Sequence, residues 1–263
     1  MRCRMVDDAR IVEAAYQDVV AEWADRDIVD RDRLAVALAD YRVRFAYHSG
    51  TIENPSITYR DTRDVFEDGR VAGFSGDPRT LFEIQNLKEC HEVILDAFAN
   101  RRPIDEQFVL DVHRTLTQGT YDNRRWAAGE RPGTYKLGDY IVGVGDVGAT
   151  PAEVRGEMAS LVSEVSRAPQ GKALTVAAYF HAVFENIHPF SDGNGRCGRE
   201  LMNYLLLMRN HPPVVVFEDD RAAYFGALEA WDAERDLEPL KAFLKAEVVR
   251  TWRRVAGVGT ASG

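Results

Sequence analysis

The sequence has few cysteines and no long apolar run. Three cysteines (Cys3, Cys90, Cys197) form an odd, widely spaced set without a CxxC pair, which excludes a disulfide framework and a thiolate zinc site and predicts a reducing, cytoplasmic location. The densest apolar stretch, residues 204–208, is far shorter than the roughly 18–20 residues that a membrane-spanning helix needs. The charged N-terminus is not followed by an apolar segment, so we expect neither a secretory signal nor a membrane helix.

Positively charged residues are outnumbered by negatively charged ones. The chain of 263 residues has 33 Lys plus Arg against 42 Asp plus Glu, a formal net charge of −9, which argues against general nucleic-acid binding. With 45% hydrophobic and 29% charged residues, the composition is that of a globular protein, not of a disordered or fibrous one. Repeats are absent, and only the small-residue tail, 256–263, is expected to be flexible.

Apolar residues recur at helical spacing along most of the chain. Ile11, Ala15, Val19 and Trp23 form one series, and a second runs from Leu34 to Phe45. Further helices are expected at 80–99, 104–117, 151–167, 172–187, 194–209, 220–232 and 236–254. Residues 59–79, rich in glycine and charge, are expected to form a loop. We therefore predict a mainly α-helical bundle, with an N-terminal helical region (1–79) and a main body (80–255).

One segment departs from this helical pattern. Residues 134–144 carry β-branched and aromatic residues on both sides of Gly138-Asp139, a dipeptide suited to a two-residue hairpin turn. A lone β-hairpin contributes little stability. We therefore expect this hairpin to serve as a docking edge.

Residues 188–199 combine several groups suited to phosphate chemistry. They read His-Pro-Phe-Ser-Asp-Gly-Asn-Gly-Arg-Cys-Gly-Arg and lie between two predicted helices. Gly193, Gly195 and the N-terminus of the second helix would together form an anion cradle. Asp192 suits Mg²⁺, which prefers one or two carboxylates plus substrate phosphates. His188 could accept a proton from an attacking hydroxyl.

The following helix carries further polar residues on one face. Arg196, Arg199 and Asn203 fall at i, i+3 and i+7, so they project on the same side. Cys197 belongs to the opposite, apolar stripe and is expected to pack in the core. Each of these features is common when it occurs alone, but the combination is what phosphoryl chemistry requires.

This segment closely resembles the signature of the Fic family, H-x-F-x-[DE]-G-N-G-R-x-x-R, at all its specified positions: His188, Phe190, Asp192, Gly193, Asn194, Gly195, Arg196 and Arg199. The resemblance implies a Fic-type helical bundle and a protein adenylyltransferase, which moves AMP from ATP to a target hydroxyl with Mg²⁺. It implies that His188 is the base and Asp192 the metal ligand. Asn194 and the glycine amides would hold the inner phosphates, and the two arginines the outer ones.

A second resemblance concerns inhibition. Ser49-Gly-Thr-Ile-Glu53-Asn54 is similar to the family's inhibitory motif, [ST]-x-x-x-E-[GN], and Pro55 predicts that the helix ends near Glu53. The resemblance implies that Glu53 pairs with Arg199 and takes the place of the γ-phosphate. It leaves open whether Glu53 also supports removal of AMP from a modified target.

The hairpin is similar in position to the flap that pairs with a target segment in Fic proteins. The resemblance gives a set of flap residues: Thr134, Tyr135, Tyr140, Ile141 and Val142. Asn203 and Tyr224 are candidates for adenine or ribose contacts. The implied partners are a target protein and, through self-modification, the chain itself, whereas the oligomeric state is not predicted.

Two alternatives remain open at this point. A Fic-fold protein can transfer another group, namely phosphate, UMP or phosphocholine. The chain could instead be a non-catalytic nucleotide-binding module, although the presence of His188 argues against this because binding alone needs no base.

Overall fold

The protein is described by a computed structural model over residues 2–140 and 148–253, with side chains from residue 9 onward. Its helices, in chain order, are α1 (Arg2–Ala24), α2 (Arg31–Ala37), α3 (Ala39–Glu53), α4 (Tyr59–Asp68), α5 (Pro78–Ala99), α6 (Glu106–Thr117), α7 (Asn123–Ala127), α8 (Pro151–Arg167), α9 (Ala173–Ile187), α10 (Asn194–Leu207), α11 (Arg221–Glu234) and α12 (Glu238–Arg253). Two 3₁₀ turns, η1 (Gln170–Lys172) and η2 (Glu218–Asp220), precede α9 and α11. The prediction of a mainly α-helical fold is confirmed.

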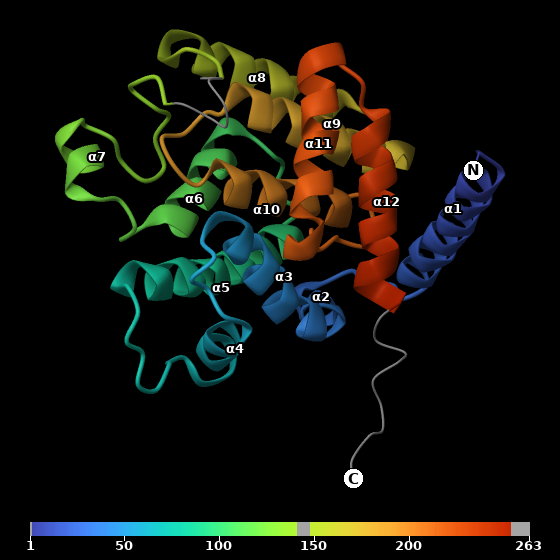
Figure 1. The fold of residues 1–263 in the computed structure, drawn as a ribbon, viewed down its shortest axis with the longest axis horizontal. Helices are drawn as coiled ribbons and strands as arrows, with labels where there is room; N and C mark the ends of the chain where they lie inside the picture. Colours follow the sequence, from blue (N-terminus) through green and yellow to red (C-terminus); the bar gives the residue numbers. More distant parts are fainter. Residues whose placement is uncertain (1, 141–147, 254–263) are drawn as a thin grey trace.

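The helices α9 and α10 form the centre of the bundle (Figure 1). The helix α10 packs against α3, α5 and α6, and α9 packs against α8, α11 and α12. The N-terminal helix α1 lies along α12, at the opposite end of the sequence (Figure 1). A single apolar core continues from Tyr16 to Val248. The packing therefore crosses the predicted boundary at residue 79, and the division into two regions stays a prediction.

Most predicted helices agree with the structure, but residues 59–79 do not form a loop throughout. Residues 59–68 form α4, whose N-terminus is capped by Thr58: its Oγ1 accepts the backbone N–H of Asp61 at 3.1 Å. The helix ends at Gly69, which has a φ of 72°. The expectation of a loop was wrong there because the charged residues of α4 lie on its solvent side and obscure the short buried stripe of Thr62, Val65 and Phe66.

Two further elements differ from the prediction. The helix expected from Leu34 to Phe45 is divided at Leu38, which separates α2 from α3. The short helix α7 was not predicted, because five residues are too few for a periodic apolar pattern.

The predicted hairpin is not confirmed. Residues 134–140 form turns and irregular backbone, and no β-strand occurs among residues 2–140 and 148–253. The second half of the predicted hairpin, including Ile141 and Val142, lies outside the described residues. The helices that are described include none long and apolar enough to cross a membrane.

Candidate functional site

The loop between α9 and α10 is bounded by two residues with left-handed backbone. His188 ends α9 with a φ of 51°, and Gly193 precedes α10 with a φ of 80°. Inside the loop, the Asn194 amide accepts the N–H of Phe190 at 2.9 Å and donates to its carbonyl at 2.8 Å. Phe190 itself is fully buried and anchors the loop in the core. The loop is therefore held in one conformation at the N-terminus of α10.

A histidine of α6, His113, contacts this loop through a hydrogen bond and ring stacking. His113 Nδ1 accepts the N–H of Gly133 at 2.9 Å, so its Nε2 carries the proton and donates to the carbonyl of Asp192 at 2.9 Å. The imidazole stacks on Phe190 with ring centroids 3.6 Å apart. Burial lowers the pKa of His113 to about 4, which keeps this hydrogen-bonded tautomer neutral.

The imidazole of His188 is half-buried at the mouth of the loop. Burial lowers its pKa to about 4, and the positive charge of Lys136 acts in the same direction. Lys136 is held against the loop because its backbone N–H donates to the carbonyl of Pro189 at 2.9 Å. His188 is thus neutral at pH 7 and able to accept a proton.

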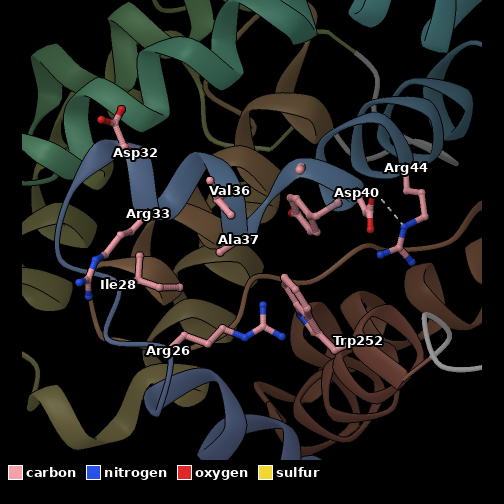
Figure 2. Close-up of a pocket in the computed structure, with 11 residues that line it drawn as sticks. Arg26, Ile28, Asp32, Arg33, Val36, Ala37, Asp40, Arg44 and Trp252 are labelled. Atoms are coloured by element: carbon pink, nitrogen blue, oxygen red, sulfur yellow. Dashed lines mark hydrogen bonds between the residues drawn. The ribbon is translucent and has the colours of Figure 1, made fainter.

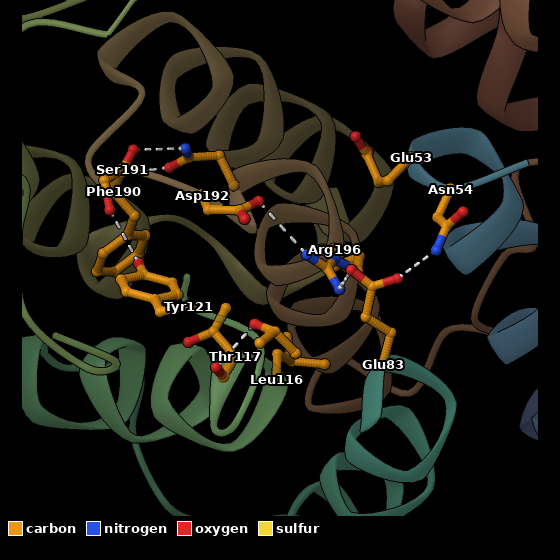
Figure 3. Close-up of polar contacts among 12 residues, drawn as sticks. Glu53, Asn54, Glu83, Leu116, Thr117, Tyr121, Phe190, Ser191, Asp192 and Arg196 are labelled. Atoms are coloured by element: carbon orange, nitrogen blue, oxygen red, sulfur yellow. Dashed lines mark hydrogen bonds and ion pairs between the residues drawn. The ribbon is translucent and has the colours of Figure 1, made fainter. Parts of the chain in front are cut away.

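The carboxylate of Asp192 faces three guanidinium groups, those of Arg79, Arg125 and Arg196; the contact with Arg196 is drawn in Figure 3. Its Oδ2 accepts from Arg79 Nη2 at 2.8 Å and lies 3.6 Å from Arg125 Nη2. Its Oδ1 lies 3.5 Å from Arg196 Nη2. Burial raises the pKa of Asp192, but the three arginines outweigh burial, so this pKa lies below its ordinary value. The carboxylate is therefore ionised, as a cation ligand must be.

Arg196 is buried and also contacts a carboxylate of α5. Its Nη1 lies 3.4 Å from Glu83 Oε1, which accepts from Arg79 Nε at 3.0 Å. The other oxygen of Glu83 accepts from Asn54 Nδ2 at 2.7 Å (Figure 3). Glu83 therefore connects Arg196 to Asn54, the residue after Glu53.

Arg199 is paired with the last turn of α3. Its Nη2 donates to Glu53 Oε1 at 2.8 Å and to the Ser49 carbonyl at 2.9 Å, and its Nε donates to Ser49 Oγ at 3.0 Å. Gly195 makes this approach feasible, since a Cβ there would collide with Glu53 Oε1. Glu53 thus lies directly over the first turn of α10, where its helical N–H groups point.

Comparison with known proteins agrees with this geometry. Residues 103–206 match the Fic/DOC family model. Residues 103–206 are a Fic/DOC domain. It is 29% identical over 211 residues to the Culex quinquefasciatus protein adenylyltransferase Fic, covering 80% of this chain and 40% of that protein. It is 31% identical over 203 residues to the Drosophila persimilis protein of the same name, covering 75% of this chain and 37% of that protein. The chain thus spans well under half the length of these curated relatives.

Solved structures show the same fold. A Fic domain containing signaling protein from Bacteroides thetaiotaomicron has a TM-score of 0.73 at 22% identity, covering 90% of this chain and 93% of that one. A Fic family protein from Desulfovibrio desulfuricans has a TM-score of 0.73 at 24% identity, covering 97% of this chain and 76% of that one. These likenesses support the Fic-type helical bundle.

The two candidates for adenine or ribose contacts, Asn203 and Tyr224, are buried in the interior of the protein. Asn203 donates to the Val214 carbonyl at 3.0 Å and accepts its N–H at 2.7 Å. The Tyr224 hydroxyl lies 2.6 Å from His181 Nε2, and its ring centroid lies 6.0 Å from Arg199 Cζ. Both side chains are buried, so their contacts with adenine or ribose stay predictions.

Three of the predicted flap residues, Thr134, Tyr135 and Tyr140, are described by the structure. They lie beside the loop between α9 and α10, which we call the Fic loop. The Tyr135 ring is 5.6 Å from the Phe190 ring, and the Tyr140 hydroxyl donates to Glu130 Oε1 at 2.7 Å. Thr134 is exposed, with its Oγ1 donating to the Arg131 carbonyl at 2.8 Å. The segment is adjacent to the Fic loop, as the prediction of a docking flap requires.

Sequence reasoning missed the residues of α5, α6 and α7 that hold the Fic loop. The spacing of Arg79 and Glu83, four apart after the helix-starting Asp77-Pro78, was a visible sign of an ion pair. Nothing local indicated that this pair would meet Asp192, 113 residues later.

A cavity of about 670 Å³ lies elsewhere, where α1, α2, α3 and α12 meet (Figure 2). It is lined by Arg26, Ile28, Asp32, Arg33, Val36, Ala37, Ala39, Asp40, Tyr41, Arg44 and Trp252. None of the predicted Fic site residues is among them, so the cavity is separate from the Fic loop.

Proposed function

We propose that this protein is an adenylyltransferase that moves AMP from ATP to a hydroxyl side chain of a target protein. The observation that carries the proposal is the juxtaposition of a neutral His188 with Asp192 and Arg199 around the N-terminus of α10. The relatives named protein adenylyltransferase Fic support the same reaction.

In the proposed reaction, His188 takes the proton of the target hydroxyl as its oxygen attacks the α-phosphorus. The bond to the β-phosphate oxygen breaks, and pyrophosphate leaves. The first N–H groups of α10 have no side-chain cap, so they can donate to phosphate oxygens. Arg196 and Arg199 would neutralise charge on the outer phosphates.

The donor set fits Mg²⁺ that arrives with the nucleotide. No cluster of three or more His, Cys, Asp or Glu residues suited to a metal is found among the described residues. One ionised carboxylate, Asp192, together with substrate phosphates is nevertheless a set that Mg²⁺ commonly uses. When bound, Mg²⁺ would stabilise the charge of the leaving pyrophosphate.

The proposal includes inhibition by Glu53. Its carboxylate occupies Arg199 and lies over Gly195, so a triphosphate would have to displace it or bind in another position. A misplacement of about 1 Å can reduce the rate roughly 10²-fold. Glu53 Oε2 accepts no hydrogen bond from the described residues, and this oxygen is the group that would activate water if the same site removes AMP.

The proposed target contact is the segment that begins at Thr134. Its position beside Pro189, fixed by the Lys136 N–H, would allow an extended target segment to pair with it by strand addition. The hydroxyl to be modified would then lie near His188.

The test compares two labels on ATP, using the Glu53→Gly chain with a cell lysate. Transfer of AMP incorporates label from the α-phosphate but not from the γ-phosphate, and His188→Ala abolishes incorporation. Label from the γ-phosphate would indicate phosphate transfer instead. Tight ATP binding without incorporation of either label would favour a non-catalytic nucleotide-binding module.

A further inference from the structure

Two large apolar side chains are exposed on the segment that follows α6. Trp126, on α7, is 46% exposed, and Leu137 is 63% exposed. They belong to one surface, because the Gly129 N–H donates to the Trp126 carbonyl at 3.1 Å and a Cβ at Gly129 would lie 3.2 Å from Leu137 Cδ1. Arg131 stacks on Trp126, and the charge of the exposed Arg124 acts on Tyr140, three residues after Leu137. We call these four residues (Arg124, Trp126, Arg131, Leu137) the active-site lip.

The lip borders the Fic loop, because two residues adjacent to lip residues in the chain contact that loop. Arg125, between Arg124 and Trp126, lies 3.6 Å from Asp192 Oδ2. Lys136, next to Leu137, donates its backbone N–H to Pro189. The helix α7 projects from the bundle at this side (Figure 1). A protein segment that reaches His188 with a hydroxyl would therefore pass over the lip.

The lip carries two positively charged, exposed side chains, Arg124 and Arg131, beside the buried carboxylate of Glu130. Arg131 stacks on the Trp126 ring, with Cζ 4.0 Å from the centroid, and its Nη1 donates to the carbonyls of Trp126 and Glu130. Neither Arg124 nor Arg131 forms an ion pair with a carboxylate within residues 2–140 and 148–253. The neighbouring Asp122 is already paired with Arg125 at 3.2 Å. The two unpaired arginines thus lie on the surface of a chain whose net charge is −9.

We propose that the active-site lip binds an acidic segment of the target protein, next to the hydroxyl that receives AMP. The inference rests on the proposed function, since it names the partner of the same site. Two guanidiniums flank an exposed tryptophan, the combination that dominates many protein interfaces. Complementary charge would orient the target as it approaches. A negatively charged protein segment fits better than a nucleic acid, because two arginines in an acidic chain give too small a basic surface for the latter.

The first measurement is binding to the otherwise unmodified chain, which does not depend on AMP transfer. Two labelled peptides of equal length would each contain one Ser, Thr and Tyr, one flanked by Asp and Glu and the other by Lys and Arg. We expect the acidic peptide to bind about tenfold more tightly by fluorescence anisotropy, and this preference to vanish in 1 M salt, where the Debye length is about 3 Å. The variant R124E/R131E should lose the preference.

The matched control is R33E/R253E, which changes the net charge equally at exposed arginines of α2 and α12 and should retain the preference. Equal binding of both peptides, or a preference unchanged by R124E/R131E in protein that melts as the parent does, would overturn the proposal. Equally tight binding of a single-stranded DNA oligonucleotide through the same arginines would assign the lip to nucleic acid instead.

The second measurement uses transfer itself. In the Glu53→Gly background, sites labelled in a lysate should be enriched in Asp and Glu near the modified hydroxyl, and R124E/R131E should remove this enrichment. Labelled sites without an acidic bias would contradict the proposal. If Glu53→Gly labels nothing, the proposed function fails, whereas the peptide measurement still decides on the lip.

Discussion

Replacing Glu53 by glycine should change the response of the protein to ATP. In the structure, Arg199 is almost fully buried and donates to Glu53 and Ser49. The variant Glu53→Gly removes the anionic partner and leaves the guanidinium with the Ser49 oxygens alone. Because Glu53 is the last residue of α3, glycine there costs less helix stability than it would in the interior.

The size of the effect follows from the exposure of the pair. The side chain of Glu53 is 36% exposed whereas that of Arg199 is 1% exposed. Breaking a fully buried pair costs about 3–5 kcal/mol, and exposed pairs contribute about 0–1 kcal/mol. We expect the free energy of unfolding of Glu53→Gly to be lower by about 1–2 kcal/mol. ATP at 100 times its Kd should raise the free energy of unfolding by about 2.7 kcal/mol. In the bound state, a phosphate would take the place of the carboxylate beside Arg199.

The assay is thermal unfolding with and without ATP, combined with automodification by labelled ATP. We expect a larger ATP-induced rise in Tm for Glu53→Gly than for the parent, and roughly 10²-fold faster automodification. Glu67→Gly, near the end of α4 in an exposed pair with Arg63, is the matched control and should change neither quantity. Equal ATP responses and equal labelling in Glu53→Gly and the parent would refute the inhibitory role.

Three further predictions concern the rest of the site. Glu83→Ala should lower the free energy of unfolding by about 3 kcal/mol, because it removes one of the two carboxylates that face the buried Arg196 and also the acceptor of Arg79 and Asn54; in urea unfolding, a loss no larger than that of Glu92→Ala, an exposed pair on the same helix, would contradict this. Arg79→Gln should remove the guanidinium closest to Asp192 Oδ2, leaving Arg125 at 3.6 Å, and raise Mn²⁺ affinity about tenfold, measured by electron paramagnetic resonance without nucleotide; unchanged affinity would mean that Arg79 does not compete with the cation. As the pH drops from 6.5 towards 5, each histidine with a lowered pKa should reduce the free energy of unfolding by up to about 1.4 kcal/mol per pH unit, because the unfolded chain binds protons that buried, neutral histidines do not. Glu185, Glu200 and Glu247, whose pKa values burial raises to about 8, 8 and 7, act in the opposite direction, but the histidines are more numerous, so urea unfolding should show a net fall; a rise in stability from pH 6.5 to 5 would contradict this. The histidines with lowered pKa values are His91, His113, His181, His188 and His211.

Local patterns in the sequence predicted the elements that carry the Fic motif. The apolar spacing before His188 and after Gly193 placed α9 and α10, since both helices are buried and repeat every 3.6 residues. Pro55 correctly predicted that α3 ends near Glu53, because a proline disfavours helical backbone in the residue before it. The pairing of Glu53 with Arg199 was expected only from the family resemblance, and the structure contains it.

The remaining contacts depend on how distant segments meet. Glu83 and Arg196 are 113 residues apart in the chain, and no periodicity relates them. His113 is one of several polar residues on α6, and nothing in its spacing indicated that its ring would stack on Phe190. Such partners are set by the packing of α5 and α6 against α10, which single-sequence patterns do not specify.

The charges of the site are consistent with the proposed inhibition by one short segment. Four guanidiniums, those of Arg79, Arg125, Arg196 and Arg199, face the carboxylates of Glu53, Glu83 and Asp192. Glu83 and Asp192 are fixed on α5 and in the Fic loop, so Glu53 is the carboxylate at the end of a helix that can most readily give way. Its displacement leaves two positive charges in excess, which favours a polyanionic triphosphate. Because Asn54 also holds Glu83 against Arg196, movement at the end of α3 would reach Arg196 and Arg199 together.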